Sequence, residues 1–200
     1  MVTVSLHTKL SQHSLRPQSQ FIEMFGEGQT IAKLKSVASV ISGKSIPKDK
    51  EDIEGPVAYI KVADFNLESN EKHIKRSSRY VDVDIAKLSK IIPVGSVIFA
   101  KNGAASLSNK KRLTLIGCCI DMNTMAILPD KEKLLPEFLF AIFESKNLSD
   151  YVRQGAIPSM DPHSIEEMDI PLPSISLQQQ FVRIAEQADK SKYYIQKLIS

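Results

Sequence analysis

The stretch IPLPSISLQQQFVRIAEQADKSKYYIQKLIS, residues 170–200, predicts the end of a globular domain and the beginning of a long helix. The segment Pro171–Pro173 cannot be helical, because proline lacks the amide hydrogen that a helix interior needs. Directly afterwards, Ser176 and Gln179 have the spacing of a capping box, in which both side chains bond to free amides of the first turn. We therefore assign residues 174–200 to a helix that leaves the domain.

The apolar positions of this helix follow a 4-3-4-3-4-3 spacing, which is typical of a coiled-coil seam. They are Leu177, Phe181, Ile184, Ala188, Ser191, Ile195 and Leu198. For the first two turns, packing of Phe181 and Ile184 into the core of the chain's own domain is an equal alternative. Beyond Ala188 no globular sequence remains to cover Ile195 and Leu198, so we expect them to pack against a partner helix.

Upstream of this helix, residues 57–127 consist of short runs rich in valine, isoleucine, tyrosine and phenylalanine. Such residues favour strands, and turn signals such as Asn102-Gly103 and Pro93-Val94-Gly95 separate the runs. We expect the strands of a curved, mainly antiparallel sheet over Val57–Val62, Arg79–Val83, Ser96–Lys101, Arg112–Ile120 and Thr124–Leu128.

Helical patterns flank this strand-rich region on both sides. We expect helices over Pro17–Phe25, from Pro136 to about Lys146, and over Leu148–Gln154, whereas Ile31–Ile41 fits either a helix or a helix followed by a strand. The fold class is therefore α/β (α+β), a curved mainly antiparallel sheet with flanking helices, over residues 21–173. Residues 1–20 form a polar segment that leads into this domain.

Composition limits the classes of function. A length of 200 residues with 42% hydrophobic content suffices for one sizeable core but scarcely for two domains. The adjacent Cys118 and Cys119 exclude a disulfide framework and a CxxC pair, which fits a reducing cytoplasm. No apolar stretch reaches the length of a membrane span, so we expect a cytoplasmic protein without a membrane partner. The net charge of +3 permits nucleic-acid binding without requiring it.

Three polar loops carry clusters of basic residues, and DNA reading needs such residues for phosphates together with amides for base edges. The candidate DNA contacts are Lys44 in the first loop, Lys75, Arg76 and Arg79 in the second, and Lys101, Asn102, Asn109, Lys110, Lys111 and Arg112 in the third.

The third cluster is the strongest, because residues 102–112 include no acidic residue. The first is diluted by Asp49, Glu51, Asp52 and Glu54, so an ordinary solvated face is the better interpretation there. Aromatic residues are too sparse for the stacking platforms that bind single strands, which favours duplex DNA.

Signatures of catalysis are weak. The chain has no Pro-Pro dipeptide for the motif of amino-group methyltransferases, and Ala38 replaces the first glycine of a P-loop before Gly43-Lys44. Pro129-Asp130 followed by Glu144-Ser145-Lys146 matches the loose spacing of a metal-dependent nuclease. Glu144 and Lys146 are expected to close a helix, however, and not to lie on a neighbouring strand.

The remaining polar constellations are equally unspecific. The four histidines form no metal-ligand pattern. Ser159, Asp161 and His163 crowd one proline-bounded loop, where side chains so close in sequence rarely form a catalytic relay. We therefore predict no catalytic residue, no metal and no cofactor.

Five stretches, taken in order, carry a resemblance to a known family. Together they resemble the target-recognition half of a type I restriction-modification specificity subunit, in which a globular recognition domain precedes a long spacer helix. The stretches are Phe21–Gly26, Ser42–Pro47, Tyr59–Asp64, Ile92–Ile98, and Ile170–Pro173 leading into Leu177–Phe181.

The resemblance implies a non-catalytic protein that reads double-stranded DNA. In that family two recognition domains, joined by antiparallel spacer helices, each read half of a split site. Separate methyltransferase (M) subunits supply S-adenosylmethionine chemistry, and a nuclease-translocase (R) subunit supplies ATP and magnesium chemistry. This chain would supply one half, and its last helix would pair with a second recognition half. The alternatives are a half-subunit that homodimerises through that helix to read a symmetric site, and a nuclease that uses Asp130 and Glu144.

Overall fold

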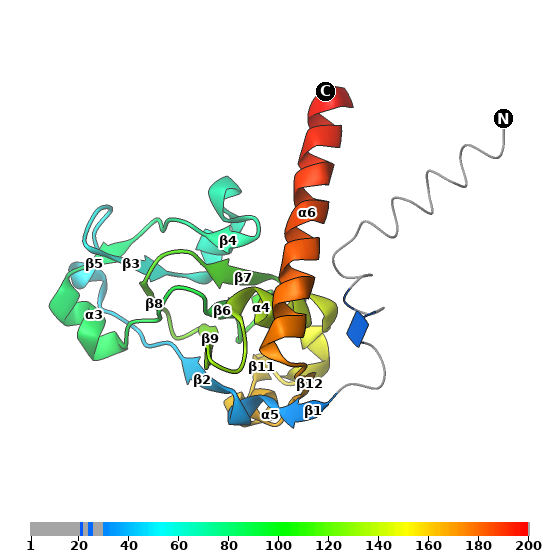
Figure 1. Ribbon diagram of the computed structural model, residues 1–200. Helices are drawn as coiled ribbons and strands as arrows, with labels where there is room; N and C mark the ends of the chain where they lie inside the picture. Colours follow the sequence, from blue (N-terminus) through cyan, green and yellow to red (C-terminus); the bar gives the residue numbers. More distant parts are fainter. Residues whose placement is uncertain (1–20, 22–23, 26–29, 200) are drawn as a thin grey trace.

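A computed structural model describes Phe21, Met24, Phe25 and residues 30–199, with side chains through Ser191. In Figure 1 the last helix, α6 (Ile175–Ile199), stands out from the body of the molecule as a single rod. The predicted N-terminal segment, residues 1–20, lies outside the described residues. So does most of the helix predicted over Pro17–Phe25, although its three described residues are helical.

The larger sheet has five strands in the spatial order β2-β9-β6-β7-β4. Neighbouring strands run antiparallel except β4 and β7, which are parallel. The bounds are β2 Ala38–Ser42, β4 His73–Ile74, β6 Val97–Ala100, β7 Lys111–Thr114 and β9 Thr124–Pro129.

The smaller sheet has three strands in the order β5-β3-β8, with β3 antiparallel to β5 and parallel to β8. Its strands are β3 Val57–Ile60, β5 Tyr80–Val81 and β8 Cys118–Ile120. Gly43 lies where the chain leaves β2 and passes this sheet. A Cβ there would sit 2.1 Å from the carbonyl oxygen of Asp121, so only glycine allows the close approach.

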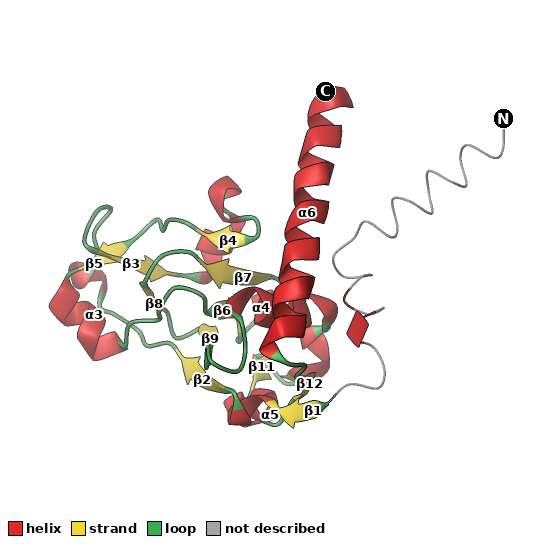
Figure 2. Ribbon diagram, in the orientation of Figure 1, coloured by secondary structure: helices red, strands yellow, loops and turns green. Residues whose placement is uncertain are grey.

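Two short antiparallel pairs complete the strands of the described residues. Figure 2 shows β1, β11 and β12 near the base of α6. The pair of β1 (Ile31–Lys33) with β12 (Asp169–Pro171) brings the two ends of the domain together just before α6 begins. The second pair joins β10 (Val152–Arg153) to β11 (Ser159–Met160).

Within residues 30–199, three further α-helices accompany the sheets, with short 3-10 helices in the loops. The α-helices are α3 Val83–Ser89, α4 Pro136–Ser145 and α5 Pro162–Glu166. The 3-10 helices are Leu34–Ser36, Lys48–Lys50, Val62–Asn66, Glu68–Asn70, Ala104–Ser108 and Leu148–Tyr151.

Alternating side chains along the strands separate the core into layers. On β6, Val97 and Phe99 face a core shared with α4 and α6, whereas Ile98 and Ala100 face the smaller sheet. The far side of the smaller sheet packs against α3. The order is therefore α4 and α6, larger sheet, smaller sheet, α3. Because the larger sheet is covered on both faces, its central strand is uniformly apolar instead of alternating.

The predicted fold class is confirmed: antiparallel-rich sheets with flanking helices precede a C-terminal helix. The segment Ile31–Ile41, for which the sequence fitted either a helix or a helix followed by a strand, forms two strands joined by a 3-10 turn. The single strand predicted over Arg112–Ile120 is wrong, because a bend at residues 115–117 carries the chain from the larger sheet to the smaller one. The helix predicted over Leu148–Gln154 ends at Tyr151, where β10 pairs with β11.

The capping box predicted at Ser176 is also wrong. Helix α6 begins at Ile175, and the Oγ of Ser174 accepts a hydrogen bond from the amide of Leu177 at 3.4 Å. Gln178 is fully buried and donates to the carbonyls of Lys133 and Pro173. These contacts anchor the first turn of α6 to the body, and so tertiary packing sets the point where the helix begins. None of the described helices is long and apolar enough to cross a membrane.

Candidate nucleic-acid interface

Two of the three basic loops lie against each other. The loop 101–110 joins β6 to β7, and the segment 61–79 contains β4, which pairs with β7. The side chain of Lys110 donates to Asn66 Oδ1 across this junction. The structure therefore brings together the second and third basic clusters.

Buried polar side chains hold the segment 61–79 in shape. Asp64 accepts hydrogen bonds from the amides of Lys61 (2.8 Å) and Ser78 (2.9 Å) and from the Ser77 hydroxyl (3.2 Å). Asn70 has no exposed surface. It donates to the carbonyls of Asp64 (3.0 Å) and Arg76 (2.8 Å).

The same Asn70 side chain accepts from the amides of Lys75 (2.9 Å) and Arg76 (3.4 Å). Both of these basic side chains are exposed, and within the part of the chain that the structure describes they have no hydrogen-bond or ion-pair partner. Fixed backbone and unoccupied charge are what a phosphate contact requires. The sequence pattern predicted Lys75 and Arg76 as DNA contacts, but no local signal pointed to Asn70, which positions their backbone.

Lys111 and Arg112, which the sequence favoured as DNA contacts, are almost buried, with 6% and 9% of their surfaces exposed. They lie on β7, between β6 and β4, in a sheet that is covered on both faces, so a side chain is enclosed whichever way it points. Lys111 Nζ donates to the carbonyl of Lys146 at 2.7 Å, and burial lowers the pKa of Lys111 to about 8. Arg112 donates to the carbonyl of Phe65 at 2.8 Å.

The other predicted contacts of the third loop serve partly as internal links. Asn109 adopts a left-handed backbone conformation (φ 56°), and its side chain accepts from the amide of Leu148 at 2.8 Å. Asn102 donates to the carbonyl of Met122, and Gly103 precedes the 3-10 helix Ala104–Ser108, so the turn signal Asn102-Gly103 opens a longer loop between the antiparallel strands β6 and β7. Lys101 is half-buried and Lys110 exposed.

The remaining two candidates lie elsewhere on the smaller sheet. Lys44 is exposed and donates to the carbonyl of Leu88 at 3.1 Å, next to α3. Arg79 is exposed at the end of the segment 61–79, with its Nε 3.8 Å from a Glu51 oxygen.

The third cluster opens into a cavity of about 230 Å³. Its walls carry three cations and two carboxylates: Lys110, Lys111, Arg112, Glu71 and Glu144, together with Asn109. The opposed charges explain how two buried cations are tolerated close together.

With these loops placed, comparison with known proteins decides the family. The model of the type I restriction modification DNA specificity domain matches residues 27–199. The chain belongs to this family. No curated protein matches it.

Three solved structures from type I restriction-modification systems share the fold of this specificity domain. One, from work on complex assembly and conformational transition of the type I R-M system, has a TM-score of 0.74 and 17% identity, covering 98% of this chain and 49% of its own. The HsdS subunit from Thermoanaerobacter tengcongensis has a TM-score of 0.72 and 18% identity, with coverage of 95% and 46%. The S subunit from M. genitalium has a TM-score of 0.56 and 15% identity, covering 86% of this chain and 41% of its own. The specificity domain thus spans about half the length of these chains.

The predicted seam of α6 divides into a part that faces the body and a part that does not. Phe181 is 1% exposed and packs edge to face on Phe21, Phe25 and Phe138, with ring centroids 5.5 to 5.7 Å away. It therefore belongs to the core of its own domain, the alternative that the sequence left open, because α6 rests on α4 here. Ala188 is also buried.

Other seam positions face outward. Leu177 and Ile184 are 39% and 37% exposed, and Ser191 is exposed as well. The side chains of Ile195 and Leu198 lie outside the described residues.

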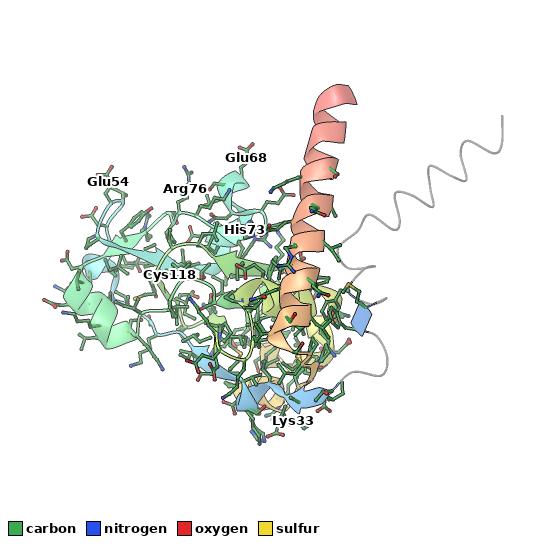
Figure 3. All side chains as sticks on the ribbon, viewed as in Figure 1. Lys33, Glu54, Glu68, His73, Arg76 and Cys118 are labelled. Atoms are coloured by element: carbon green, nitrogen blue, oxygen red, sulfur yellow. The ribbon has the colours of Figure 1, made fainter. Side chains whose placement is uncertain are left out.

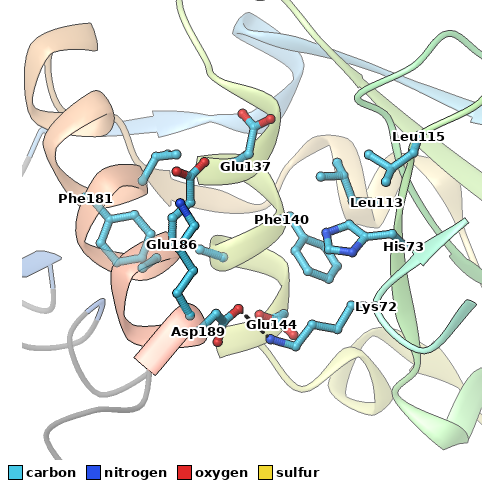
Figure 4. Close-up of a pocket in the computed structure, with 14 residues that line it drawn as sticks. Lys72, His73, Leu113, Leu115, Glu137, Phe140, Glu144, Phe181, Glu186 and Asp189 are labelled. Carbon is cyan, nitrogen blue, oxygen red and sulfur yellow. Dashed lines mark hydrogen bonds and ion pairs between the residues drawn. The ribbon is translucent and has the colours of Figure 1, made fainter. Parts of the chain in front are cut away.

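A groove of about 400 Å³ separates α6 from the edge of the larger sheet (Figure 4). Phe181 and Glu186 line one side, and His73 and Leu113 line the other. An ion pair between Lys72 and Asp189, 2.9 Å long, crosses it. Burial lowers the pKa of His73, and the charges of Lys75 and Lys72 lower it further.

The residues that suggested a nuclease or a relay have other roles in the specificity domain. Asp130 pairs with Lys133 at 2.8 Å, and Glu144 lies on α4 instead of a strand beside β9. Asp161 caps α5 and binds Arg153 at 2.8 Å. Across the described residues no group of three His, Cys, Asp or Glu side chains could hold a metal ion.

Proposed function

We propose that the specificity domain binds double-stranded DNA and reads one half of a split target site. The observation that carries this proposal is the junction of the segment 61–79 with the loop 101–110, which presents Lys75, Arg76 and Lys110 on ordered backbone. Exposed cations on fixed loops supply the phosphate contacts, which set the position of the protein on the duplex. Lys101 and Asn102 begin the same loop, and we take them as the candidates for contacts with base edges.

Lys111 and Arg112 take a supporting role in this proposal. Their side chains are held by main-chain carbonyls of Lys146 and Phe65, so they tie β7 to the end of α4 and to the segment 61–79, and they add positive potential beneath that segment. Arg79 and Lys44 extend the contact surface toward the smaller sheet.

The proposed partners are supported by two observations. The chain spans about half the length of the matched structures, and α6 has exposed apolar residues. A second recognition half, whether on the same polypeptide or in a second copy, would pack against Leu177, Ile184 and the turns that follow. Methyl transfer would belong to M subunits, and cleavage with translocation to an R subunit, so the domain itself would need no cofactor. A homodimer that reads a symmetric site remains the second candidate, favoured by the same exposed face of α6.

Salt-dependent binding of the purified chain to a pool of random duplexes tests the proposal. The double variant Lys75→Ala/Arg76→Ala removes two phosphate contacts. Its affinity should fall at least about tenfold, and the slope of log affinity against log salt should become shallower by about 2. Methylation mapping in cells that carry the complete system would supply the target sequence.

The matched control is Lys33→Ala/Lys35→Ala, which removes the same charge at the edge of the molecule away from Arg76 (Figure 3). Lys33 and Lys35 pair with Asp169 and Glu167, far from the loops. Equal losses in both double variants, or no loss in Lys75→Ala/Arg76→Ala, would show that the contact surface lies elsewhere.

A further inference from the structure

A second basic recess lies beside the segment 61–79. It is a cavity of about 370 Å³ lined by Lys48, Glu51, Asp52, Ile53, Lys61 and Arg79. Three of these side chains are cationic and two are acidic. Arg79 is one of the DNA contacts predicted from the sequence.

The Glu51 carboxylate lies between the cationic groups of Lys61 and Arg79. Its side chain is only 6% exposed, and its two oxygens accept hydrogen bonds from Lys61 Nζ at 2.7 and 2.6 Å. Arg79 Nε lies 3.8 Å from the same carboxylate. Lys61 Nζ also sits over the Tyr59 ring, 5.3 Å from its centroid, so the ammonium group has a fixed position.

The loop that carries Glu51 does not depend on this carboxylate for its shape. Asp52 and Tyr80 exchange two main-chain hydrogen bonds, of 2.9 and 2.8 Å, which tie the loop to β5. The preceding turn, Lys48–Lys50, is a 3-10 helix closed by its own backbone. The backbone of this loop is therefore held by main-chain bonds that do not involve the Glu51 side chain.

The Glu51 carboxylate lies beside the Lys61 ammonium and the Arg79 guanidinium group, a position that would also suit another oxyanion. Arginine and lysine together suit phosphate, which offers more acceptor oxygens than a carboxylate and is recognised through the planar guanidinium fork. Without the Glu51 side chain the recess would carry three cations against the single carboxylate of Asp52. Asp52 itself accepts a hydrogen bond from the amide of Ile53, within its own loop.

We propose that this recess binds a phosphate group through Lys48, Lys61 and Arg79, and that the Glu51 carboxylate holds the place of that phosphate in the unbound protein. The proposal rests on the proposed function in one respect, since duplex DNA is its expected source of phosphate. Figure 3 places Glu54, from the loop of Glu51, and Arg76 along the same edge of the molecule. A duplex held by Arg76 would therefore pass the recess. One of its phosphates would bind there only by displacing the Glu51 carboxylate.

The test compares Glu51→Gln with the wild type in the same salt-dependent duplex assay. Removing the competing charge should raise affinity at least about fivefold and steepen the salt slope by about 1. Glu54→Gln is the matched control, because it removes the same charge from an exposed position three residues away. Lys61→Met should weaken binding, and thermal unfolding of each variant checks that the fold is intact.

Inorganic phosphate separates the two sources of the ligand. If Glu51→Gln leaves duplex affinity unchanged but phosphate raises the Tm of this variant and not that of Lys61→Met, the recess takes free phosphate. If neither duplex affinity nor phosphate binding changes, or if Glu54→Gln has the same effect, the recess is not a phosphate site. A wild-type chain that binds no duplex would contradict the proposed function alone, since the phosphate arm still tests the recess.

Discussion

Two regions of this molecule are held together by opposite kinds of interaction. Around α4 and α6, an aromatic cluster of Phe21, Phe25, Phe138 and Phe181 packs with ring centroids 5.0 to 5.7 Å apart. The segment 61–79, by contrast, is held largely by directional hydrogen bonds to two buried side chains, Asp64 and Asn70. One region joins a helix to the body, and the other presents cations to solvent.

Because of this difference, we expect the two regions to respond differently to substitutions. Apolar burial is non-directional and scales with area, so loss of a ring should lower the stability of the whole domain. Hydrogen bonds of Asn70 determine where particular backbone groups lie, so their loss should displace Lys75 and Arg76 before it unfolds the rest. Three substitutions test this contrast.

The largest effect is expected for Phe181→Ala. The substitution leaves a cavity between α6 and the body, because Phe25, Phe138 and Phe21 surround the ring. It should cost about 3 to 5 kcal/mol in the free energy of unfolding, measured in urea. Ile184→Ala, three residues along the same helix but exposed, should cost less than about 1 kcal/mol. Similar losses in the two variants would mean that Phe181 is not a core residue.

A smaller and more local effect is expected for Asn70→Ala. The substitution leaves the carbonyl of Arg76 and the amide of Lys75 without a partner and removes one of the two bonds to the carbonyl of Asp64, at a cost of about 2 to 3 kcal/mol. Hydrogen exchange should accelerate at residues 75–78 while amides of β6 stay protected. Glu68→Ala, an exposed position in the same segment, should cost less than about 1 kcal/mol and serves as the control. Uniform acceleration across the domain would contradict a local role.

The smallest effect is expected for the ion pair that crosses the groove beside α6. Lys72 and Asp189 are each 45% exposed, so solvent screens their attraction. A double-mutant cycle of Lys72→Met and Asp189→Asn should give a coupling of about 0.5 kcal/mol or less, falling with salt. A coupling above about 2 kcal/mol would mean that charge, and not the aromatic cluster, holds α6 against the body.

Local patterns predicted β3, β6, β9 and α4 within a few residues, since apolar runs and Pro136 act through the neighbouring chain. They failed where distant segments decide the outcome. The predicted helix 148–154 ends early because β11 offers strand pairing, and the predicted cap at Ser176 is displaced because Gln178 bonds to the loop before α4. For the candidate site, the pattern found the exposed Lys75 and Arg76 but could not identify the buried polar residues that position them.

By itself the sequence carried the resemblance to the family, predicted the fold class with its C-terminal helix, and located the loops in which basic residues gather, because each of these patterns is built from residues that are close together along the chain. Only the tertiary structure decided that Lys111 and Arg112 are enclosed, that Phe181 packs within its own domain, and that Glu51 pairs with Lys61. The physical reason is that burial and charge pairing depend on contacts between remote segments. Arg112, for example, donates to a carbonyl 47 residues away, and no local pattern encodes such a contact.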